Sequence, residues 1–458
     1  MDFPLFGRRL IVTIVTVGAS CTSSTQGDTW WALRAGDEIV RRHSISLTDR
    51  YSYTAYGAPW PDHEWLWQAA IAVLHGIGGL PLVTLFVGLL AGAALAVSVS
   101  GRARRTDLAV LLLAIPGVMG AWAVRPQVLS MLLFAIMLWL LRTRRWWWAV
   151  PLMLLWANAH GGVVFGGVAL GAGCVAALVE RRHLAPLLAV TALGALATLC
   201  TPLGIGLWHY VLTSGSRPFE QRITEWQPPY RHLSIYTLVF WTWLAAICVL
   251  VLVRRRRLRT WPGKLGLATT LATLPLALDA SRNMVMFVLA ALPLAVHLLR
   301  NEDAPRRGDD GVPLARPTLA VAAALGALVT AAVYVADPPA LGWQPMSRQI
   351  AAAIRACPGH VYTSYDSGAY LIWFTPSVPV FVDNRQDPYS ERILDLSVLD
   401  EHSDYRPTFA RYDVRCAALL TSGRSGASVL EHAGWRTAAK DPTWVVLTAP
   451  GTSLGSPS

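Results

Sequence analysis

The stretch GDTWWALRAGDEIVRRHSISLTDRYSYTAYGAPWPDHEWLWQ, residues 27–68, is the largest polar island in the first two-thirds of the chain. It follows one short apolar run and precedes a long series of them. Long loops are usually either functional or disordered. Disorder is not expected here, because the content of Trp and Tyr is far above that of disordered segments. We therefore interpret residues 27–68 as a folded loop that carries an acidic site on a membrane scaffold.

The composition is that of a membrane protein. Hydrophobic residues make up 54% of the 458 residues and charged residues only 15%, with a mean hydropathy of +0.41. The net charge of +11 comes from arginine clusters in the short gaps between apolar runs. Such clusters mark cytoplasmic loops. The lipid bilayer is therefore an expected partner, and nucleic acid is not.

Apolar runs near the length of a bilayer core predict about eleven spans and a mainly α, polytopic transmembrane helical bundle at residues 1–336. The first run, Leu10–Cys21, follows two arginines, which place the N-terminus in the cytoplasm. A cleaved signal peptide is the alternative for this run. Outer loops are expected at residues 25–65 and 201–233, and the last span at residues 319–335. The predicted location is the inner or plasma membrane, with multiple passes.

Beyond residue 336 the composition changes, and short predicted helices alternate with strand-like segments at residues 360–374, 378–382, 416–420 and 444–447. This alternation predicts an α/β domain at residues 337–458. The odd number of spans places it outside the cell, on the side of the first loop. Cys357 and Cys416 both fall in this domain, and a disulfide between them is left open.

Inside the first loop, Thr29–Arg42 is predicted to be a helix that lies along the membrane surface with its Trp side chains toward the lipid. Residues 51–54 alternate like a strand. A second helix is predicted from Asp62 to His75, with Asp62 as its N-cap.

Three acidic residues of this loop are catalytic candidates: Asp28, Asp62 and Glu64. Asp28 follows the first span, and a partly buried carboxylate there can act as a general base. The alternative for Asp28 is a helix N-cap. Asp62 and Glu64 flank His63 and need partners from elsewhere in the chain to form a site, the alternative being capping and interfacial hydrogen bonding.

Basic residues on the outer side are candidates for binding a phosphate, because a guanidinium binds phosphate in bidentate geometry. These are Arg125, Arg222 and Arg282. For each, the alternative is a salt bridge to a loop carboxylate such as Glu225. Asn158 and His160 lie at the outer end of a span, where ionisable residues often mark a site, although a packing histidine is an equal alternative.

Asp383 and Arg385 are further candidates, because they follow a predicted strand of the C-terminal domain, where ligands often bind. Turn-stabilising side chains are the alternative. The sequence has no Walker loop, dinucleotide-binding glycine pattern, CxxC pair, HExxH or GxSxG motif. ATP-driven transport, redox chemistry and zinc proteolysis therefore lose support.

Several motifs together resemble the GT-C superfamily of membrane glycosyltransferases, and more narrowly a bacterial group whose reaction is mostly unassigned. They are Asp28-Thr-Trp30-Trp31, Ser52-Tyr53-Thr54, Glu64-Trp65-Leu66, Arg125-Pro126-Gln127, Asn158-Ala-His160-Gly161-Gly162 and Phe381-Val-Asp383-Asn384-Arg385. The resemblance implies a GT-C-like bundle, a polyprenyl-phosphate-linked sugar donor and Asp28 as the catalytic base. The chain departs from the family pattern at Thr29, where many members have a second acidic residue.

The mechanism implied by the resemblance is inverting sugar transfer to an extracytoplasmic lipid, glycan or protein. Arg125 or Arg282 would hold the donor phosphate, and Trp30, Trp31 and Trp60 would stack on sugar rings. No metal ligand set is predicted and no cofactor is required, but a divalent cation remains compatible with the acidic residues. The alternative function is a non-catalytic transporter or assembly factor for lipids or glycans of the cell envelope.

Overall fold

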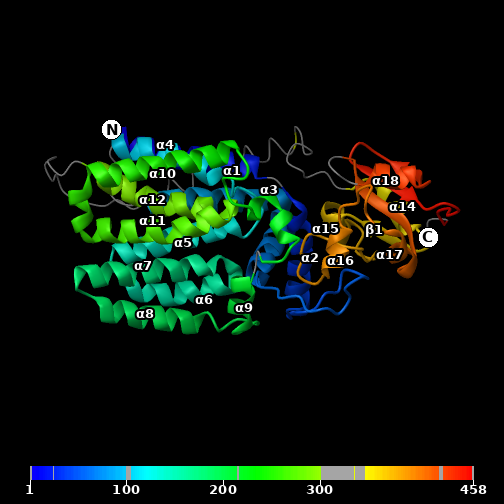
Figure 1. The fold of residues 1–458 in the computed structure, drawn as a ribbon, viewed down its shortest axis with the longest axis horizontal. Helices are drawn as coiled ribbons and strands as arrows, with labels where there is room; N and C mark the ends of the chain where they lie inside the picture. The colour runs from blue at the N-terminus through cyan, green and yellow to red at the C-terminus, as the bar shows by residue number, and fades with distance from the viewer. Residues whose placement is uncertain are drawn as a thin grey trace. The chain divides into compact units, whose positions relative to one another are not determined.

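The computed structural model describes residues 3–23, 25–99, 105–213, 216–300, 335, 346–421 and 426–455. The chain forms two compact units (Figure 1). Unit 1 comprises Met1–Ser24 and Ile77–Leu341, and unit 2 comprises Thr25–Gly76 and Gly342–Ser458. The division expected at residue 336 assigned the first loop to the membrane domain. In the structure this loop instead groups with the C-terminal segment.

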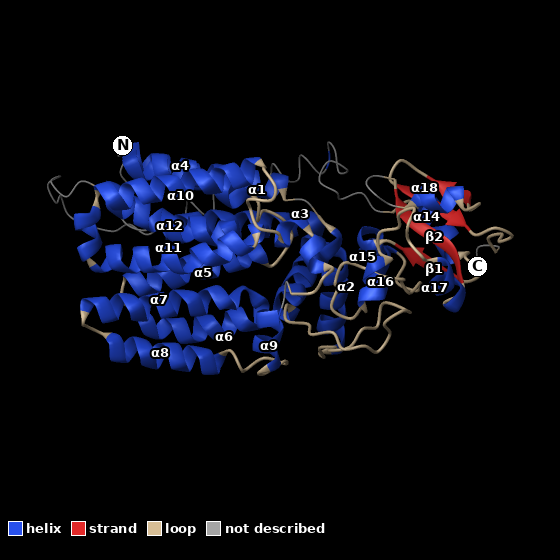
Figure 2. Cartoon of the chain, in the orientation of Figure 1, coloured by secondary structure: helices blue, strands red, loops and turns tan. Residues whose placement is uncertain are grey.

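Unit 1 is built from helices, as the apolar runs predict (Figure 2). Its main helices are α1 (Phe3–Thr22), the second part of α3 (Trp65–Ser98), α4 (Arg105–Met119), α5 (Gln127–Arg142), α6 (Ala149–Ala159), α7 (Val164–Glu180), α8 (Leu184–Ala197), α10 (Ile235–Val253), α11 (Trp261–Asp279) and α12 (Met284–Leu299). The second outer loop also holds a short helix, α9 (Gly206–Thr213), with the single turns η3 (Glu220–Arg222) and η4 (Thr224–Trp226). The last predicted span, at residues 319–335, lies almost wholly outside the described residues.

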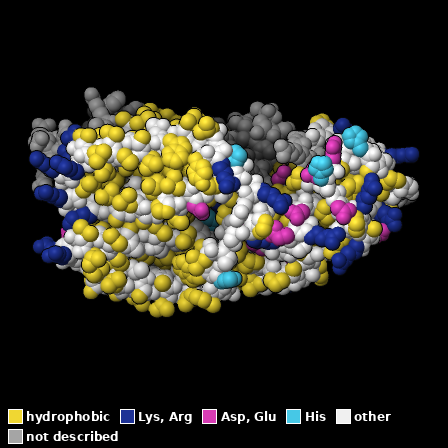
Figure 3. Space-filling model, in the orientation of Figure 1, with side chains coloured by type: hydrophobic (Ala, Val, Ile, Leu, Met, Phe, Trp, Pro, Cys, Tyr) yellow, Lys and Arg dark blue, Asp and Glu magenta, His cyan; other side chains and the backbone are white. Residues whose placement is uncertain are grey.

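Many large apolar side chains of unit 1 are exposed, which is unusual for a water-soluble surface. They include Leu178, Val179, Leu196, Leu252 and Val253, each at least 60% exposed. In Figure 3 hydrophobic side chains cover the visible flank of the helical bundle, and Lys and Arg gather at one end of it. An apolar flank with charges at the end is the surface that a bilayer requires.

Within the described residues, four helices are long and apolar enough to cross a membrane: Trp65–Ser98, Gly161–Glu180, Ile235–Val253 and Ser281–Leu299. Further apolar helices are shorter, among them Leu10–Thr22 and Gln127–Arg142. The protein is therefore a membrane protein, whereas the count of about eleven spans stays a prediction.

Small residues let α1 and α3 approach closely inside unit 1. A Cβ at Gly88 would stand 2.0 Å from Ser20 Oγ, and one at Gly92 would stand 2.1 Å from Thr16 Oγ1. Close approach through glycine is typical of helix pairs in membranes. This contact fixes the first span of the chain against the bundle.

Unit 2 holds a four-stranded sheet in the order β1-β2-β4-β3. Strand β1 (His360–Thr363) pairs in parallel with β2 (Val414–Leu420), and β4 (Trp444–Thr448) pairs antiparallel with both β2 and β3 (Arg436–Lys440). The helices of this segment are α14 (Arg348–Arg355), α15 (Tyr365–Phe374), α16 (Glu391–Asp395), α17 (Arg406–Arg411) and α18 (Ala427–His432). The predicted C-terminal domain of helices and strands is confirmed.

Two strand predictions in this segment are wrong. Residues 360–374 were expected to be strand-like throughout, but the strand ends at Thr363 and α15 follows. Ser364 caps this helix, with its side chain accepting from the Ser367 backbone N–H, because a short hydroxyl side chain satisfies a free N–H of the first turn. The predicted strand at residues 378–382 reduces to one bridge, between Ser52 and Val380.

The helix predicted at Thr29–Arg42 is α2 (Gly27–Arg42). Its Trp side chains do not point into lipid. Trp30 lies 4.7 Å from Phe374 of α15 between ring centroids and is 1% exposed, because this apolar face packs within unit 2. The second helix, α3, begins at Trp65, so Asp62 is not its N-cap.

The first loop is joined to the C-terminal segment by the backbone. The Tyr53 N–H donates to the Val380 carbonyl, and the Val380 N–H donates to the Tyr51 carbonyl, at 3.1 and 2.9 Å. The Tyr53 hydroxyl also donates to the Val361 carbonyl at 3.1 Å. Residues 51–54 therefore contribute an extended segment to unit 2 rather than a separate hairpin.

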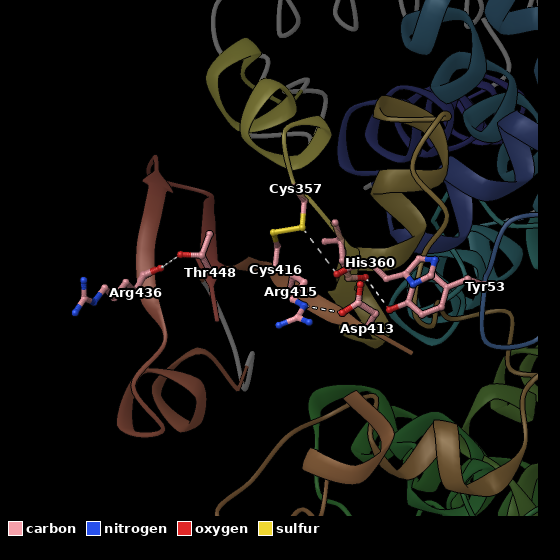
Figure 4. The surroundings of a disulfide bond; sticks show 9 residues. Tyr53, Cys357, His360, Asp413, Arg415, Cys416, Arg436 and Thr448 are labelled. Atoms are coloured by element: carbon pink, nitrogen blue, oxygen red, sulfur yellow. Dashed lines mark hydrogen bonds and ion pairs between the residues drawn. A yellow bond between two sulfur atoms is a disulfide. The ribbon is translucent and has the colours of Figure 1, made fainter. Parts of the chain in front are cut away.

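A disulfide joins Cys357 and Cys416 beside the start of the sheet (Figure 4). Cys357 precedes β1 and Cys416 lies in β2, so the bond ties two neighbouring strands together. Next to it, the Tyr53 ring stacks on His360 with centroids 4.1 Å apart. The disulfide that the sequence left open is therefore formed in the structure.

Candidate active site

Asp28 is the second residue of α2, in the turn whose free N–H groups favour a negative charge. Its Oδ1 accepts a hydrogen bond from Nδ2 of Asn384, 356 positions away in the sequence. The residue is partly exposed, and the N-cap is Gln26 rather than Asp28. Gly27 makes room for this contact, since a Cβ there would stand 2.6 Å from Asn384 Nδ2. The amide orients a carboxylate that is still accessible.

The Trp residues predicted to stack on sugars are buried inside unit 2. Trp30, Trp31 and Trp60 are 1%, 7% and 4% exposed. Trp31 and Trp60 meet edge to face, with centroids 5.9 Å apart. Their rings form the core under the start of α2, which supports a structural role.

Asp62 is 3% exposed and accepts a hydrogen bond from Gln68 Nε2 at 2.6 Å. Burial, reinforced by the charge of Glu64, raises the pKa of Asp62 to about 7. A carboxyl with this pKa exchanges a proton near neutral pH. The structure therefore provides a second acid in unit 2 with the ionisation behaviour of a general acid or base.

His63 and Glu64 form a neighbouring pair, with His63 Nε2 3.4 Å from Glu64 Oε1. Burial disfavours the charged ring, but the hydrogen bond and charge of Glu64, together with the charge of Asp387, raise the pKa of His63 above its usual value. These two residues and Asp62 occupy consecutive positions before α3. They form a polar cluster directly before the first residue of α3.

Asp383 and Arg385, predicted to bind substrate, lie in the interior. The Arg385 guanidinium donates to Asp383 at 2.7 and 2.9 Å and pairs with Asp49 Oδ1 at 2.6 Å. All three side chains are 0% exposed. Burial disfavours the charge, but the two carboxylates hold the pKa of Arg385 well above its usual value. This geometry supports a structural role rather than the predicted contact with substrate.

In unit 1, two of the predicted phosphate-binding residues share one carboxylate. Arg125 Nη1 donates to Glu225 Oε2 at 3.0 Å, and Arg282 Nη1 lies 3.9 Å from Glu225 Oε1. Burial disfavours the carboxylate charge, but Arg282 and Arg125 hold the pKa of Glu225 below its usual value. Arg282 also lies over the Trp226 ring, 4.3 Å from its centroid.

This arginine pair carries one positive charge in excess of its carboxylate and stays accessible. The Arg125 and Arg282 side chains are each 23% exposed, and Glu225 is 39% exposed. The structure thus forms, for Arg125 and Arg282, the salt bridge to Glu225 that the sequence left as the alternative to phosphate binding. A second anion is the group that such a cluster can take.

The other candidates of unit 1 form hydrogen bonds with residues outside the arginine pair. Asn158 donates to the backbone carbonyls of Leu154 and Cys200. His160 Nδ1 lies 2.7 Å from Ser130 Oγ, and the indole N–H of Trp156 donates to the same oxygen. Arg222 belongs to η3 and is exposed. These contacts are compatible with the packing alternative, and the binding roles expected for Asn158 and His160 stay predictions.

The acidic residues of the second outer loop do not form a metal-binding pair. Glu225 is held by two arginines, and Glu220 is 6% exposed with Oε2 accepting from the Arg217 N–H. At Asp28 the contact is an amide donor rather than a second carboxylate. A divalent cation prefers several carboxylate or carbonyl oxygens, and its compatibility with the acidic residues of this chain stays a prediction.

Sequence reasoning missed two partners of the candidate residues, Asn384 beside Asp28 and Asp49 beside Arg385. Asn384 was quoted only as part of the motif around Asp383, and Asp49 only as one acid of the loop. Both act through contacts between residues far apart in the chain. The only available signal was that both segments are rich in polar residues.

No protein-family model and no curated protein matches the sequence. Solved structures do match. The archaeal oligosaccharyltransferase AglB from Archaeoglobus fulgidus, in complex with an inhibitory peptide and a dolichol-phosphate, matches with a TM-score of 0.62 and 10% identity, over 90% of this chain and 69% of AglB. The apo form of the A. fulgidus oligosaccharyltransferase matches with a TM-score of 0.58 and 11% identity, over 92% and 70%.

ArnT from Cupriavidus metallidurans bound to undecaprenyl phosphate also matches, with a TM-score of 0.49 and 15% identity, over 99% of this chain and 98% of ArnT. At such low identities a structural match establishes a fold and not a reaction. The chain therefore shares the fold of the oligosaccharyltransferase AglB.

Proposed function

We propose that this protein is a membrane glycosyltransferase that moves a sugar from a polyprenyl-phosphate-linked donor to an extracytoplasmic acceptor. The observation that carries the proposal is the carboxylate of Asp28, oriented by Asn384 and partly exposed at the start of α2, in a chain with a GT-C-like fold. A solved relative in fold, AglB, was determined with a dolichol-phosphate.

Asp28 acts as the general base in this proposal. It takes the proton from the acceptor hydroxyl or amine as that atom attacks the anomeric carbon. The bond between the anomeric carbon and the phosphate oxygen breaks, and the polyprenyl phosphate leaves with the electron pair. Attack opposite the leaving group inverts the anomeric centre. The hydrogen bond from Asn384 supports this role, because an oriented base loses less entropy in the transition state.

Arg125 and Arg282 neutralise the leaving phosphate. Their shared Glu225 holds both guanidiniums in place while leaving one excess positive charge. Preorganised charge of this kind is usually the largest electrostatic contribution to such a transfer.

We place unit 2 outside the cytoplasm and the protein in the inner or plasma membrane. The disulfide between Cys357 and Cys416 supports this orientation, because structural disulfides persist in oxidising compartments. The grouping of the first loop with the C-terminal segment agrees with it, since both then lie on one side of the bilayer. Asp28 is thereby presented to acceptors of the cell envelope.

The test is the substitution Asp28→Asn in membranes that carry the protein, with transfer followed by mass spectrometry of envelope lipids and glycans. Loss of a general base is expected to lower the rate about 10²- to 10⁴-fold. Asp37→Asn is the matched control, because Asp37 lies on the same helix and forms an ion pair with the exposed Arg41. It should leave transfer unchanged.

Normal product formation by Asp28→Asn would refute the base assignment. If the wild-type protein changes which side of the membrane a lipid or glycan occupies without forming any new glycosidic bond, the transporter or assembly alternative holds instead.

A further inference from the structure

A basic hollow lies on unit 2, and none of the steps above uses it. Its volume is about 200 Å³. Its charged lining consists of three guanidiniums, from Arg34, Arg42 and Arg50, and one carboxylate, from Glu38. Apolar residues Ile372, Pro376, Val378 and Pro379 line the rest together with Tyr51.

The positive charges of this hollow are not all compensated. Arg34 pairs with Glu38 at 2.9 Å. Arg42 and Arg50 are exposed, and among the described residues neither has an ion-pair partner. With three arginines against one glutamate, the lining carries a net charge of +2. Two uncompensated guanidiniums around one hollow favour an anion.

The fold, and not local sequence, brings the two arginines together. Arg42 is the last residue of α2, and the chain then turns through His43, which has a left-handed backbone conformation. Arg50 follows Asp49, which the buried pair with Arg385 fixes in the interior. Both guanidiniums are thus carried by backbone that is anchored nearby, so that ligand binding has to order their side chains but not the backbone.

A smaller hollow of about 20 Å³ continues from the first and shares Glu38, Arg42, Arg50 and Tyr51 with it. It adds the hydroxyls of Ser44 and Ser46 and the side chain of Asp62. Its volume is enough for about one water molecule or one ligand hydroxyl. Hydroxyl and carboxyl groups beside two guanidiniums suit a ligand that has both an anionic group and hydroxyls.

We propose that the larger hollow, together with the smaller one beside it, binds an anionic carbohydrate group. This group is a sugar that carries a phosphate or a carboxylate. Arg42 and Arg50 hold the anion, the proline-rich wall takes the apolar face of the ring, and the serines and Glu38 take hydroxyls. The inference does not depend on sugar transfer. The same group can come from a soluble glycan or from the headgroup of an anionic lipid.

The test measures binding to the full-length protein in neutral detergent by calorimetry. The soluble probes are inorganic phosphate and glucose 1-phosphate, and the lipid probe is phosphatidylglycerol in mixed micelles. The double variant Arg42→Gln/Arg50→Gln should bind the preferred probe at least about tenfold more weakly, because a hydrogen bond to a charged group contributes about 1.5–3 kcal/mol. If the double variant binds a soluble probe more weakly than the wild type does, the source is a glycan. If only its binding to the micelles is weaker, the source is a lipid.

The matched control is Arg41→Gln, since Arg41 neighbours Arg42 but pairs with Asp37 and does not line the hollow. It should bind like the wild type, as should Asp28→Asn, which separates this site from sugar transfer. The proposal would be overturned if the double variant bound the preferred probe as tightly as the wild type. It would also be overturned if the wild type bound none of the three probes. An unfolding temperature equal to that of the wild type is the control that shows the double variant to be folded.

Discussion

Two of the arginine clusters in the described part of the chain combine guanidinium and carboxylate groups in opposite proportions. In unit 2, one guanidinium, Arg385, lies between two carboxylates, and all three side chains are fully buried. In unit 1, two guanidiniums, Arg125 and Arg282, share one carboxylate, and all three remain partly exposed. The first cluster has no capacity left for an additional anion. The second has an excess positive charge that water and a ligand can reach.

This difference shows that the surroundings of an arginine decide whether it has a structural role or can bind a ligand. Its presence in a polar motif does not decide this. A buried pair is weak evidence for net stabilisation, but breaking one leaves an uncompensated charge in the interior. A partly exposed pair contributes little stability and can be changed at small cost to the fold. The contrast therefore predicts different phenotypes for equivalent substitutions.

The largest effect is expected for Arg385→Met. It leaves Asp49 and Asp383 buried without their cation, which should lower the free energy of unfolding by about 3–5 kcal/mol. The measurement is thermal or denaturant unfolding of the purified protein, together with the reactivity of Cys357 and Cys416 in unit 2. Arg415→Met is the control, since Arg415 pairs with Asp413 in the exposed range, at 53% and 58%, and should cost at most about 1 kcal/mol. Equal costs for the two variants would remove the contrast between buried and exposed pairs.

Arg282→Gln should act on activity and not on folding. Loss of a charge-assisted contact to the donor phosphate should lower kcat/KM about 10- to 100-fold, because such a hydrogen bond contributes about 1.5–3 kcal/mol. Transfer assays in membranes measure kcat/KM, and the unfolding temperature reports on folding. Arg231→Gln, at an exposed arginine of the same outer loop, should change neither. A parallel loss of folded protein in Arg282→Gln would show that the exposed cluster is structural too.

Asp62→Asn tests the buried acid of unit 2 that accepts a hydrogen bond from Gln68. Since the folded state raises the pKa of Asp62 to about 7 from an ordinary value of 3.8, the unfolded state releases this proton first as the pH rises. The wild type should therefore lose stability between about pH 4 and pH 7, and asparagine should remove this loss. We expect Asp62→Asn to gain about 2 kcal/mol relative to the wild type between pH 5 and pH 8. Unfolding curves at these two pH values measure it, and a pH-independent difference would contradict it.

The smallest effect is expected for Asn384→Ala, which removes the contact to Asp28 and leaves Asp383 and Arg385 in place. A net hydrogen bond contributes about 0.5–1.5 kcal/mol, so kcat should fall about 3- to 10-fold. KM and the unfolding temperature should stay near the wild-type values, because the amide orients a base and does not hold the fold. A change in unfolding temperature with unchanged kcat would assign Asn384 to the structural network instead.

Several elements of the fold were predictable from local sequence. The helix expected at Thr29–Arg42 is α2 almost to the residue, because its apolar positions recur at helical spacing. The strand expected at Cys416–Leu420 is the core of β2. The helix start at Asp62 was wrong by three residues, since Asp62 bonds to Gln68 instead of capping the helix. Apolar length alone also leaves the number of spans unsettled, because only some of the helices are long enough to cross a membrane.

The candidate site was predictable only in part. Asp28, Arg125 and Arg282 were named from the sequence, but Asn384 as the partner of Asp28 was not. Trp30 and Trp31 looked like surface aromatics, yet they pack against α15, which a local pattern does not reveal.

By itself, the sequence determined the membrane class, the helices and the candidate acids and arginines, because these follow from composition and from spacing within a few turns. Only the tertiary structure decided that the first loop and the C-terminal segment form one unit, that Arg385 is sealed between Asp49 and Asp383, and that Asn384 meets Asp28. Such contacts join residues hundreds of positions apart. They depend on how whole elements pack, which no periodicity within a single segment encodes.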